Sequence, residues 1–111
     1  MRKRASTSGV GLAEVELRYV APELMTGQSA DVRSDIFTMG VLAYEMATAT
    51  RPYEGTSMPT LLGSMLRGTP DDPRIAQPGL PDRAAAAILK ALRPSPADRF
   101  ATAREFGNEL S

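Results

Sequence analysis

Few side chains of this 111-residue chain could take part in acid–base or metal chemistry. The sequence has no histidine and no cysteine, so the most common general base, the thiol nucleophile and the preferred transition-metal ligands are missing. Two close carboxylate pairs remain, Asp71 with Asp72 and Asp31 with Asp35. The first lies in a proline-rich stretch typical of a solvated loop, and the second flanks the start of an expected helix, where carboxylates are favoured anyway. We therefore expect no catalytic, cofactor-binding or metal-binding residue in this chain.

The charge balance argues against partners that are recognised by charge. Lysine plus arginine and aspartate plus glutamate each total 13, so the formal net charge is zero. No excess charge points to nucleic acid or to an anionic membrane surface. The basic start, MRKR, is not followed by the apolar stretch of a signal peptide, and no apolar run approaches the ~18 residues of a membrane span. We expect a single cytoplasmic domain with no nucleic-acid or membrane partner.

The elements that would position the polar side chains are all helical. Apolar spacing, capping residues and helix breakers predict helices or helical turns over 22–25, 35–47, 57–67, 83–92, 95–98 and 102–110. Asp82 is the expected cap of the fourth, and Thr102 with Glu105 matches a capping box. Residues 1–14 are expected to form a flexible arm, and 69–81, with four prolines, a loop. The fold class is all-α, with five or six short helices around a buried central helix.

The helix over 35–47 is the expected centre of the fold. Its apolar residues spread around the whole circumference, and such a helix is buried on all sides. Ser34 is a suitable N-cap, and Asp35 would stabilise the helix start through the dipole. Few elements remain in so short a chain to surround this helix, which predicts either a thin cover or an exposed apolar face.

Three blocks of sequence occur in the order of a known family. The run 19–23 (YVAPE) resembles the Ala-Pro-Glu motif that closes the activation segment of protein kinases. The run 35–40 (DIFTMG) resembles the Asp-x-Trp/Tyr-Ser-x-Gly block that opens their long central helix, and 44–46 (YEM) and 51–53 (RPY) follow it as in the family. The run 96–100 (PADRF) resembles their Pro-x-x-Arg-Phe segment. Over residues 15–110 the chain resembles the C-terminal lobe of a bacterial-type serine/threonine kinase.

The resemblance implies roles for several residues. Glu23 would form a bidentate ion pair with Arg99, because the glutamate of the first block pairs with the arginine of the last. Asp35 would accept hydrogen bonds from the catalytic loop, and where that loop is absent its remaining role is to cap the central helix. Substrate would contact the residues just before the Ala-Pro-Glu block, which are Leu17, Arg18 and Tyr19.

The parts of a kinase that move phosphate have no counterpart in the sequence. The family needs a glycine-rich phosphate cover, a strand lysine, a His-Arg-Asp loop and a metal-binding Asp-Phe-Gly. The chain has no histidine and no G-x-G-x-x-G, and its only lysines are Lys3 and Lys90. Val15 and Glu16 also stand where the family has Gly-Thr. ATP and magnesium belong to the intact family, and we expect neither to bind this chain.

Two interpretations remain. In the first, 15–111 is a partial kinase domain cut at the activation segment, with 1–14 an arm or a remnant of that segment, and its partner is the missing N-terminal half. In the second, the chain is a stand-alone helical protein-binding or pseudokinase-like module. Its binding surface could then include Leu61, Leu62 and Met65, which otherwise belong to the core.

Overall fold

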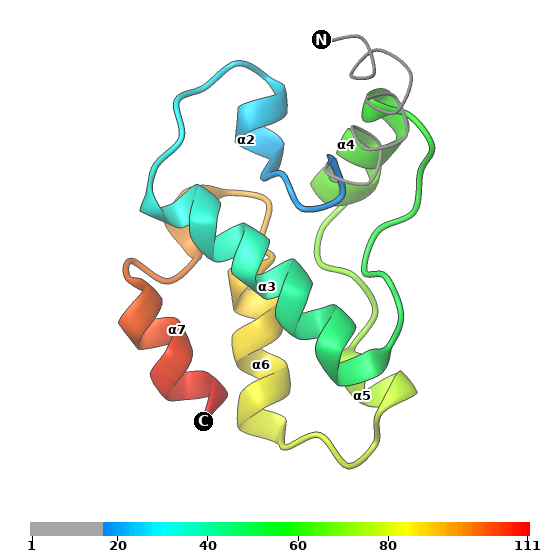
Figure 1. Cartoon of the computed structure of the whole chain (residues 1–111), viewed down its shortest axis with the longest axis vertical. Coiled ribbons are helices and arrows are strands. Elements are labelled where there is room, and N and C mark those ends of the chain that lie inside the picture. The colour runs from blue at the N-terminus through cyan, green and yellow to red at the C-terminus, as the bar shows by residue number, and fades with distance from the viewer. Residues whose placement is uncertain (1–16) are drawn as a thin grey trace, which may run out of the picture.

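The computed structural model describes residues 17–111, and within them every regular element is helical (Figure 1). The expected arm over 1–14, together with Val15 and Glu16, lies outside the described residues. The elements are α2 (Pro22–Met25), α3 (Val32–Thr48), α4 (Met58–Leu66), α5 (Pro73–Ala76), α6 (Asp82–Ala91), the 3-10 turn η1 (Pro96–Asp98) and α7 (Ala103–Leu110). The predicted all-α class is therefore confirmed. No helix of this part of the chain is long and apolar enough to cross a membrane.

Helix α3 is the element that joins the rest of the fold. It runs obliquely across the molecule in Figure 1 and packs against α5, α6, α7 and η1, while α2 contacts α4. Its buried side chains enter two clusters. Phe37, Val41 and Tyr44 join the larger one with Tyr53, Leu61, Met65, Ile88 and Leu92. Ile36 joins the smaller one with Ala87, Ala91, Phe100 and Phe106.

Helix α3 begins three residues earlier than the sequence predicts. Asp31 is the N-cap, and its carboxylate accepts hydrogen bonds from the backbone N–H of Arg33 at 2.8 Å and of Ser34 at 3.3 Å. The assignment of Ser34 as N-cap and of Asp35 as helix cap is wrong. Asp35 lies exposed in the first turn, and the Ser34 hydroxyl donates instead to the Glu23 carboxylate at 2.7 Å. The Ser34 hydroxyl thus contacts the ion pair of another element, and the helix end is capped by Asp31.

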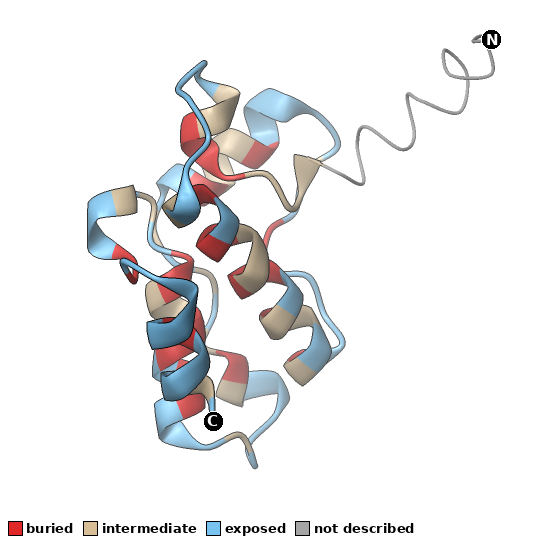
Figure 2. Ribbon diagram, turned by 60° about the vertical axis from the view of Figure 1, so that its left-hand side comes forward, coloured by how far each residue is buried: buried red, intermediate tan, exposed pale blue. Residues whose placement is uncertain are grey.

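The same helix is not buried on all sides, as the shortage of covering elements in this short chain leads us to expect. Val32, Leu42 and Met46 are 47%, 44% and 85% exposed. Spaced ten and then four residues apart, these side chains lie on one face together with Asp35. Figure 2 shows α3 passing from buried to exposed colours around its circumference. One apolar face of the central helix is thus open to solvent.

The proline-rich stretch 69–81 contains a short helix that the sequence reading missed. Asp72 caps α5 by accepting from the backbone N–H of Arg74 at 2.9 Å. The Arg74 guanidinium lies 2.6 Å from both the Asp72 and the Asp82 carboxylates. Asp82 is the first residue of α6, and Pro81 stands at the N-cap position. The expectation that Asp82 caps this helix is therefore wrong. The Arg74 side chain lowers the pKa of Asp72 to about 2, so this carboxylate is engaged in an ion pair rather than poised as an acid.

The crossing of α3 over α6 requires glycine at position 40. A Cβ there would lie 2.9 Å from the Ala91 Cβ and 3.0 Å from the Leu92 Cδ2. We expect Gly40→Ala to lower the free energy of unfolding by about 1–2 kcal/mol, because overpacking outweighs the better helix propensity of alanine. Gly63→Ala, in α4 with nothing within 4 Å, should instead raise it by up to about 1 kcal/mol. Urea unfolding of both variants tests this, and equal stabilisation of the two would contradict close packing at Gly40.

Candidate functional site

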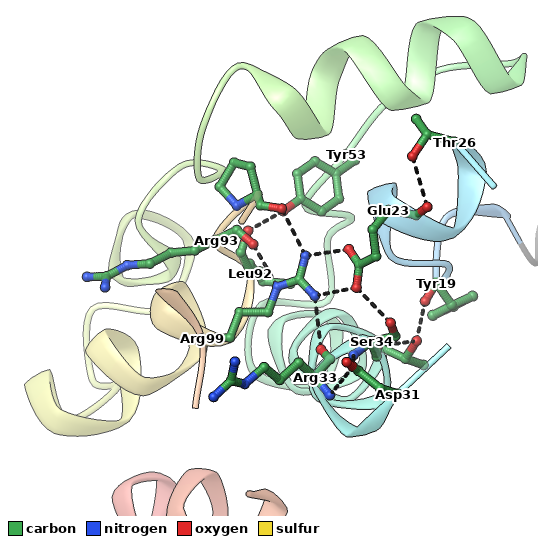
Figure 3. A network of polar contacts seen from close by, with 12 residues as sticks. Tyr19, Glu23, Thr26, Asp31, Arg33, Ser34, Tyr53, Leu92, Arg93 and Arg99 are labelled. Carbon is green, nitrogen blue, oxygen red and sulfur yellow. Dashed lines mark hydrogen bonds and ion pairs between the residues drawn. The ribbon is translucent and has the colours of Figure 1, made fainter. Parts of the chain in front are cut away.

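An ion pair between Glu23 and Arg99 lies within a network of polar contacts (Figure 3). The Arg99 Nη1 and Nη2 atoms donate to the two Glu23 carboxylate oxygens at 2.8 and 2.9 Å. The side chains are 0% and 6% exposed. The pair that the sequence implied is thus present, and it joins α2 to the segment after η1 across 76 residues.

All remaining donors of the Arg99 guanidinium are also used. They reach three backbone carbonyl oxygens, those of Arg93 at 2.8 Å, Arg33 at 2.9 Å and Pro94 at 3.1 Å. The carbon at the centre of the guanidinium lies 4.9 Å from the Phe37 ring centre, so an aromatic face covers the cation. A buried ion pair is tolerable only when its other hydrogen-bonding groups are satisfied, and here they are.

The environment of Glu23 keeps its carboxylate charged. Burial acts to raise the pKa of Glu23, but hydrogen bonds from Arg99 and Ser34 outweigh it and hold that pKa below its ordinary value of 4.5. Because the folded-state pKa is lowered, this carboxylate stabilises the fold above its unfolded-state pKa, and the contribution is lost as pH falls through the folded-state pKa.

We therefore expect the chain to lose stability on acidification from about pH 4.5 downward. Glu23→Gln should be less stable than the parent chain at neutral pH but should lose less on acidification, because it has no carboxylate to protonate there. Urea midpoints at pH 7 and pH 3 measure the difference. Equal losses in the parent chain and in the variant would assign the acid sensitivity to other carboxylates.

The residues just before α2 are held against α3. The Tyr19 hydroxyl donates to the Glu45 Oε1 at 2.8 Å, and the Thr38 hydroxyl donates to the Tyr19 carbonyl oxygen. The hydrogen bond to Glu45 is the largest cause of the raised pKa of Tyr19. Leu17 and Tyr19 also pack against the larger core cluster. Two of the three residues assigned to substrate contact thus also serve the fold.

An open surface depression of about 370 Å³ lies at the end of α3, and the Tyr19 hydroxyl bonds to one of its lining residues, Glu45. It is lined by Arg18, Glu45, Ala49, Thr50 and Arg51. The Arg18 Nε and the Glu45 Oε2 are both buried, and neither has a hydrogen-bond partner among the described residues. An unsatisfied buried polar group costs about 1–3 kcal/mol, so such atoms are uncommon in folded proteins. Sequence reasoning named Arg18 but not Glu45, although the YEM block contains it.

Two of the three side chains considered for a docking surface belong to the core. Leu61 and Met65 are 1% and 0% exposed, and both belong to the larger cluster. Leu62 is half-buried. The depression at the end of α3 therefore offers a better candidate for binding than these three side chains. Within residues 17–111, no group of three or more His, Cys, Asp or Glu residues is placed to hold a metal ion.

The protein family of this chain follows from its similarity to a known family model. The family model described as protein tyrosine and serine/threonine kinase matches residues 2–106. This chain belongs to the protein kinase family. Its fold, with the Glu23–Arg99 pair and the central helix α3, is that of the helical C-terminal lobe of a kinase.

Individual kinases agree with this assignment. The chain is 36% identical to the tyrosine-protein kinase MasK of Myxococcus xanthus over 107 residues, which are 96% of this chain and 17% of MasK. It is 34% identical to the serine/threonine-protein kinase PknB of Mycobacterium tuberculosis over 93 residues, 84% of this chain and 15% of PknB. The crystal structure of the Rad53 kinase domain and SCD2 matches with a TM-score of 0.69 at 27% identity, covering 85% of this chain and 36% of that one. This kinase-family chain thus spans about one sixth of the length of these two curated relatives.

Proposed function

We propose that this chain is the C-terminal part of a serine/threonine protein kinase domain and that it does not transfer phosphate by itself. The observation that carries the proposal is the composition: without a histidine the 111 residues cannot contain the His-Arg-Asp loop that supplies the catalytic base of the family. The sequence blocks that resemble the family have structural roles instead: they form the Glu23–Arg99 ion pair and the start of α3. ATP and magnesium would be bound by residues outside this chain.

The partner that we propose is the remaining, N-terminal part of a kinase domain. The open face of α3 supports this, because Val32, Leu42 and Met46 form an apolar surface with the exposed Asp35 carboxylate among them. Exposed apolar patches commonly mark protein interfaces, and on the central helix of a kinase lobe the expected partner is another part of the kinase domain. The relevant contacts would bury the three apolar side chains and give Asp35 backbone N–H groups to accept from.

Phosphate transfer and retention of a partner test this proposal together. Incubation of the chain with radiolabelled ATP and casein should give background labelling with or without magnesium. The complementary part of the MasK kinase domain should be retained by the immobilised chain, and Leu42→Asp should abolish retention. Leu66→Asp, at a side chain 55% exposed on α4, is the matched control and should leave retention unchanged. Magnesium-dependent transfer by the chain alone would overturn the catalytic part of the proposal, and failure to retain MasK would overturn the partner.

A second candidate function is a stand-alone, pseudokinase-like module that uses the α3 face for an unrelated protein. The 85% exposure of Met46 favours any function that covers this face. The two candidates differ in the retention experiment, because only a kinase half-domain partner should select the MasK fragment over an unrelated helical protein of equal size.

A further inference from the structure

The first described residues lie beside the open face of α3. Tyr19 is held on that helix at two points, because the Thr38 hydroxyl donates to its carbonyl oxygen and its own hydroxyl donates to the Glu45 Oε1 at 2.8 Å. Leu42 lies four residues after Thr38 and three before Glu45, so it neighbours both on the helix surface. The segment 1–16 is therefore attached at the edge of the open face.

The open face fits an occupant with apolar side chains and a cation. It consists of four exposed side chains, those of Val32, Asp35, Leu42 and Met46. Within residues 17–111, no ion pair reaches the Asp35 carboxylate. A second copy of the same face fits poorly, because a two-fold contact would bring two Asp35 carboxylates together and supply no cation.

The segment 1–16 has both kinds of group. Residues 2–4 (RKR) are three consecutive cations. Three apolar residues lie nearer to the described structure: Val10, Leu12 and Val15. The two carboxylates of the segment, at Glu14 and Glu16, are at the opposite end from the cations. The order suits the face, since Leu42 is beside the attachment point and the Asp35 carboxylate is further along the helix.

The segment is long enough to cross the face. Asp35 and Leu42 are seven residues apart on α3, a distance of about 10 Å along the axis. The stretch from Arg4 to Leu17 spans about 20 Å as a helix and up to about 43 Å when extended. A segment tethered so closely has an effective concentration in the millimolar range at the face, so contacts that are weak between separate molecules suffice.

We propose that residues 1–16 bind the open face of α3 in the free chain and compete there with the N-terminal part of a kinase domain. Leu12 and its apolar neighbours cover Leu42 and Met46, and the cations of residues 2–4 pair with Asp35. The segment is an autoinhibitory cover, because a partner finds the face only in those molecules in which the segment is released. The competition rests on the proposed function, whereas the contact within the free chain does not.

A spin label on the segment tests this contact in the intact 111-residue chain. The sequence has no cysteine, so Ala5→Cys accepts a nitroxide at one position only. The methyl signals of Met46 and Met58 are followed by NMR, and Met58, exposed on α4, is the matched control. We expect the label to broaden the Met46 signal and to leave that of Met58 unchanged. Equal broadening of the two signals, or none at Met46, would overturn the proposal.

A mixed sample separates the segment from a second copy of the chain. It combines spin-labelled chain without isotopes and isotope-labelled chain without the spin label, so it reports only contacts between molecules. We expect no broadening of Met46 in this sample. Broadening as strong as in the singly labelled chain would assign the face to a second copy and contradict an intramolecular cover.

Substitutions within the segment connect the contact to partner binding. Leu12→Ser should remove the broadening of Met46, whereas Ala13→Ser, its neighbour in the sequence, should preserve it. Leu12→Ser should also bind the complementary MasK fragment about threefold more tightly, the gain expected if the segment covers the face in about two thirds of the molecules. Broadening that persists in Leu12→Ser would mean that the segment lies near the face without binding it, which refutes the proposal.

The two proposals fail in different ways. If the MasK fragment is not retained by any variant, the proposed partner is wrong, but the broadening of Met46 in the free chain is unaffected. If the fragment is retained equally by the parent chain and by Leu12→Ser, the partner stands and the autoinhibitory role of residues 1–16 is wrong.

Discussion

Replacement of Arg99 by alanine should lower the free energy of unfolding by about 3–5 kcal/mol, because the Glu23 carboxylate would remain buried without its cation. The side chains are 0% and 6% exposed, so water cannot replace the guanidinium without opening the fold. The carbonyl groups of Arg93, Arg33 and Pro94 would lose their donor as well. Since small domains unfold with about 5–15 kcal/mol in total, this loss is a large fraction of the stability of the chain.

Two further variants separate the ion pair from the general effect of truncation. Arg99→Lys should also lose more than about 1 kcal/mol, because a single ammonium cannot contact both Glu23 oxygens and the three carbonyls. Glu23→Met combined with Arg99→Met should recover part of the loss, since it removes both charges. Arg104→Ala, exposed on α7, should stay within about 0.5 kcal/mol of the parent chain. Urea titrations measure all four, and a loss below ~0.5 kcal/mol in Arg99→Ala would contradict a buried pair.

The sequence predicts those features that depend on neighbouring residues. The capping box at the start of α7 is one: the Thr102 hydroxyl accepts from the Glu105 N–H at 3.1 Å, and the Glu105 carboxylate accepts from the Thr102 N–H at 3.2 Å. The turn of α2 is another, since Pro22 favours its first position and Gly27 has the positive φ of 93° that ends such a turn. Both need only residues a few positions apart.

Features that depend on distant residues are less predictable. Asp31 and Ser34 are both good N-cap residues, and local rules do not choose between them. In the fold Asp31 is the cap, and the Ser34 hydroxyl donates to Glu23 from another element, a contact that local rules do not predict. The all-round apolar character of α3 likewise predicts burial but not which face is covered, because that depends on which neighbouring elements are present. The sequence therefore identified the helix and the shortage of cover around it, but not which of its faces stays open.

The depression at the end of α3 is beyond sequence reasoning for the same reason. Tyr19 and Glu45 are 26 residues apart, and only the fold brings them within 2.8 Å. The family resemblance named the YEM block as a landmark without indicating that one oxygen of its glutamate would be buried and unpaired. Whether a buried polar atom has a hydrogen-bond partner depends on how the side chains pack, and this is known only from the three-dimensional structure.

Phe37→Ala should cost about 3–5 kcal/mol, the usual range for the loss of a buried phenylalanine. Phe37 is 0% exposed and stacks on Tyr53, with ring centres 5.8 Å apart and an interplanar angle of 10°. The Arg99 guanidinium also lies over its ring, with the guanidinium carbon 4.9 Å from the ring centre. Loss of the ring would therefore remove core contacts and also admit water beside the ion pair. The stabilisation from Phe37 packing and the stabilisation from the Glu23–Arg99 pair are thus expected to be coupled.

A matched change on the same helix shows whether burial is the cause. Leu42→Ala, at a side chain 44% exposed on α3, should cost less than about 1 kcal/mol. Phe37→Ala combined with the double methionine variant at Glu23 and Arg99 should cost less than the sum of the separate losses. In the double methionine variant the ring has no ion pair to shield from water, so its removal there costs only the core contacts. Urea midpoints with near-ultraviolet circular dichroism of the tyrosines provide the readout. Strict additivity would mean that Phe37 stabilises the core independently of the ion pair, and the Arg99–Phe37 contact would then contribute nothing of its own.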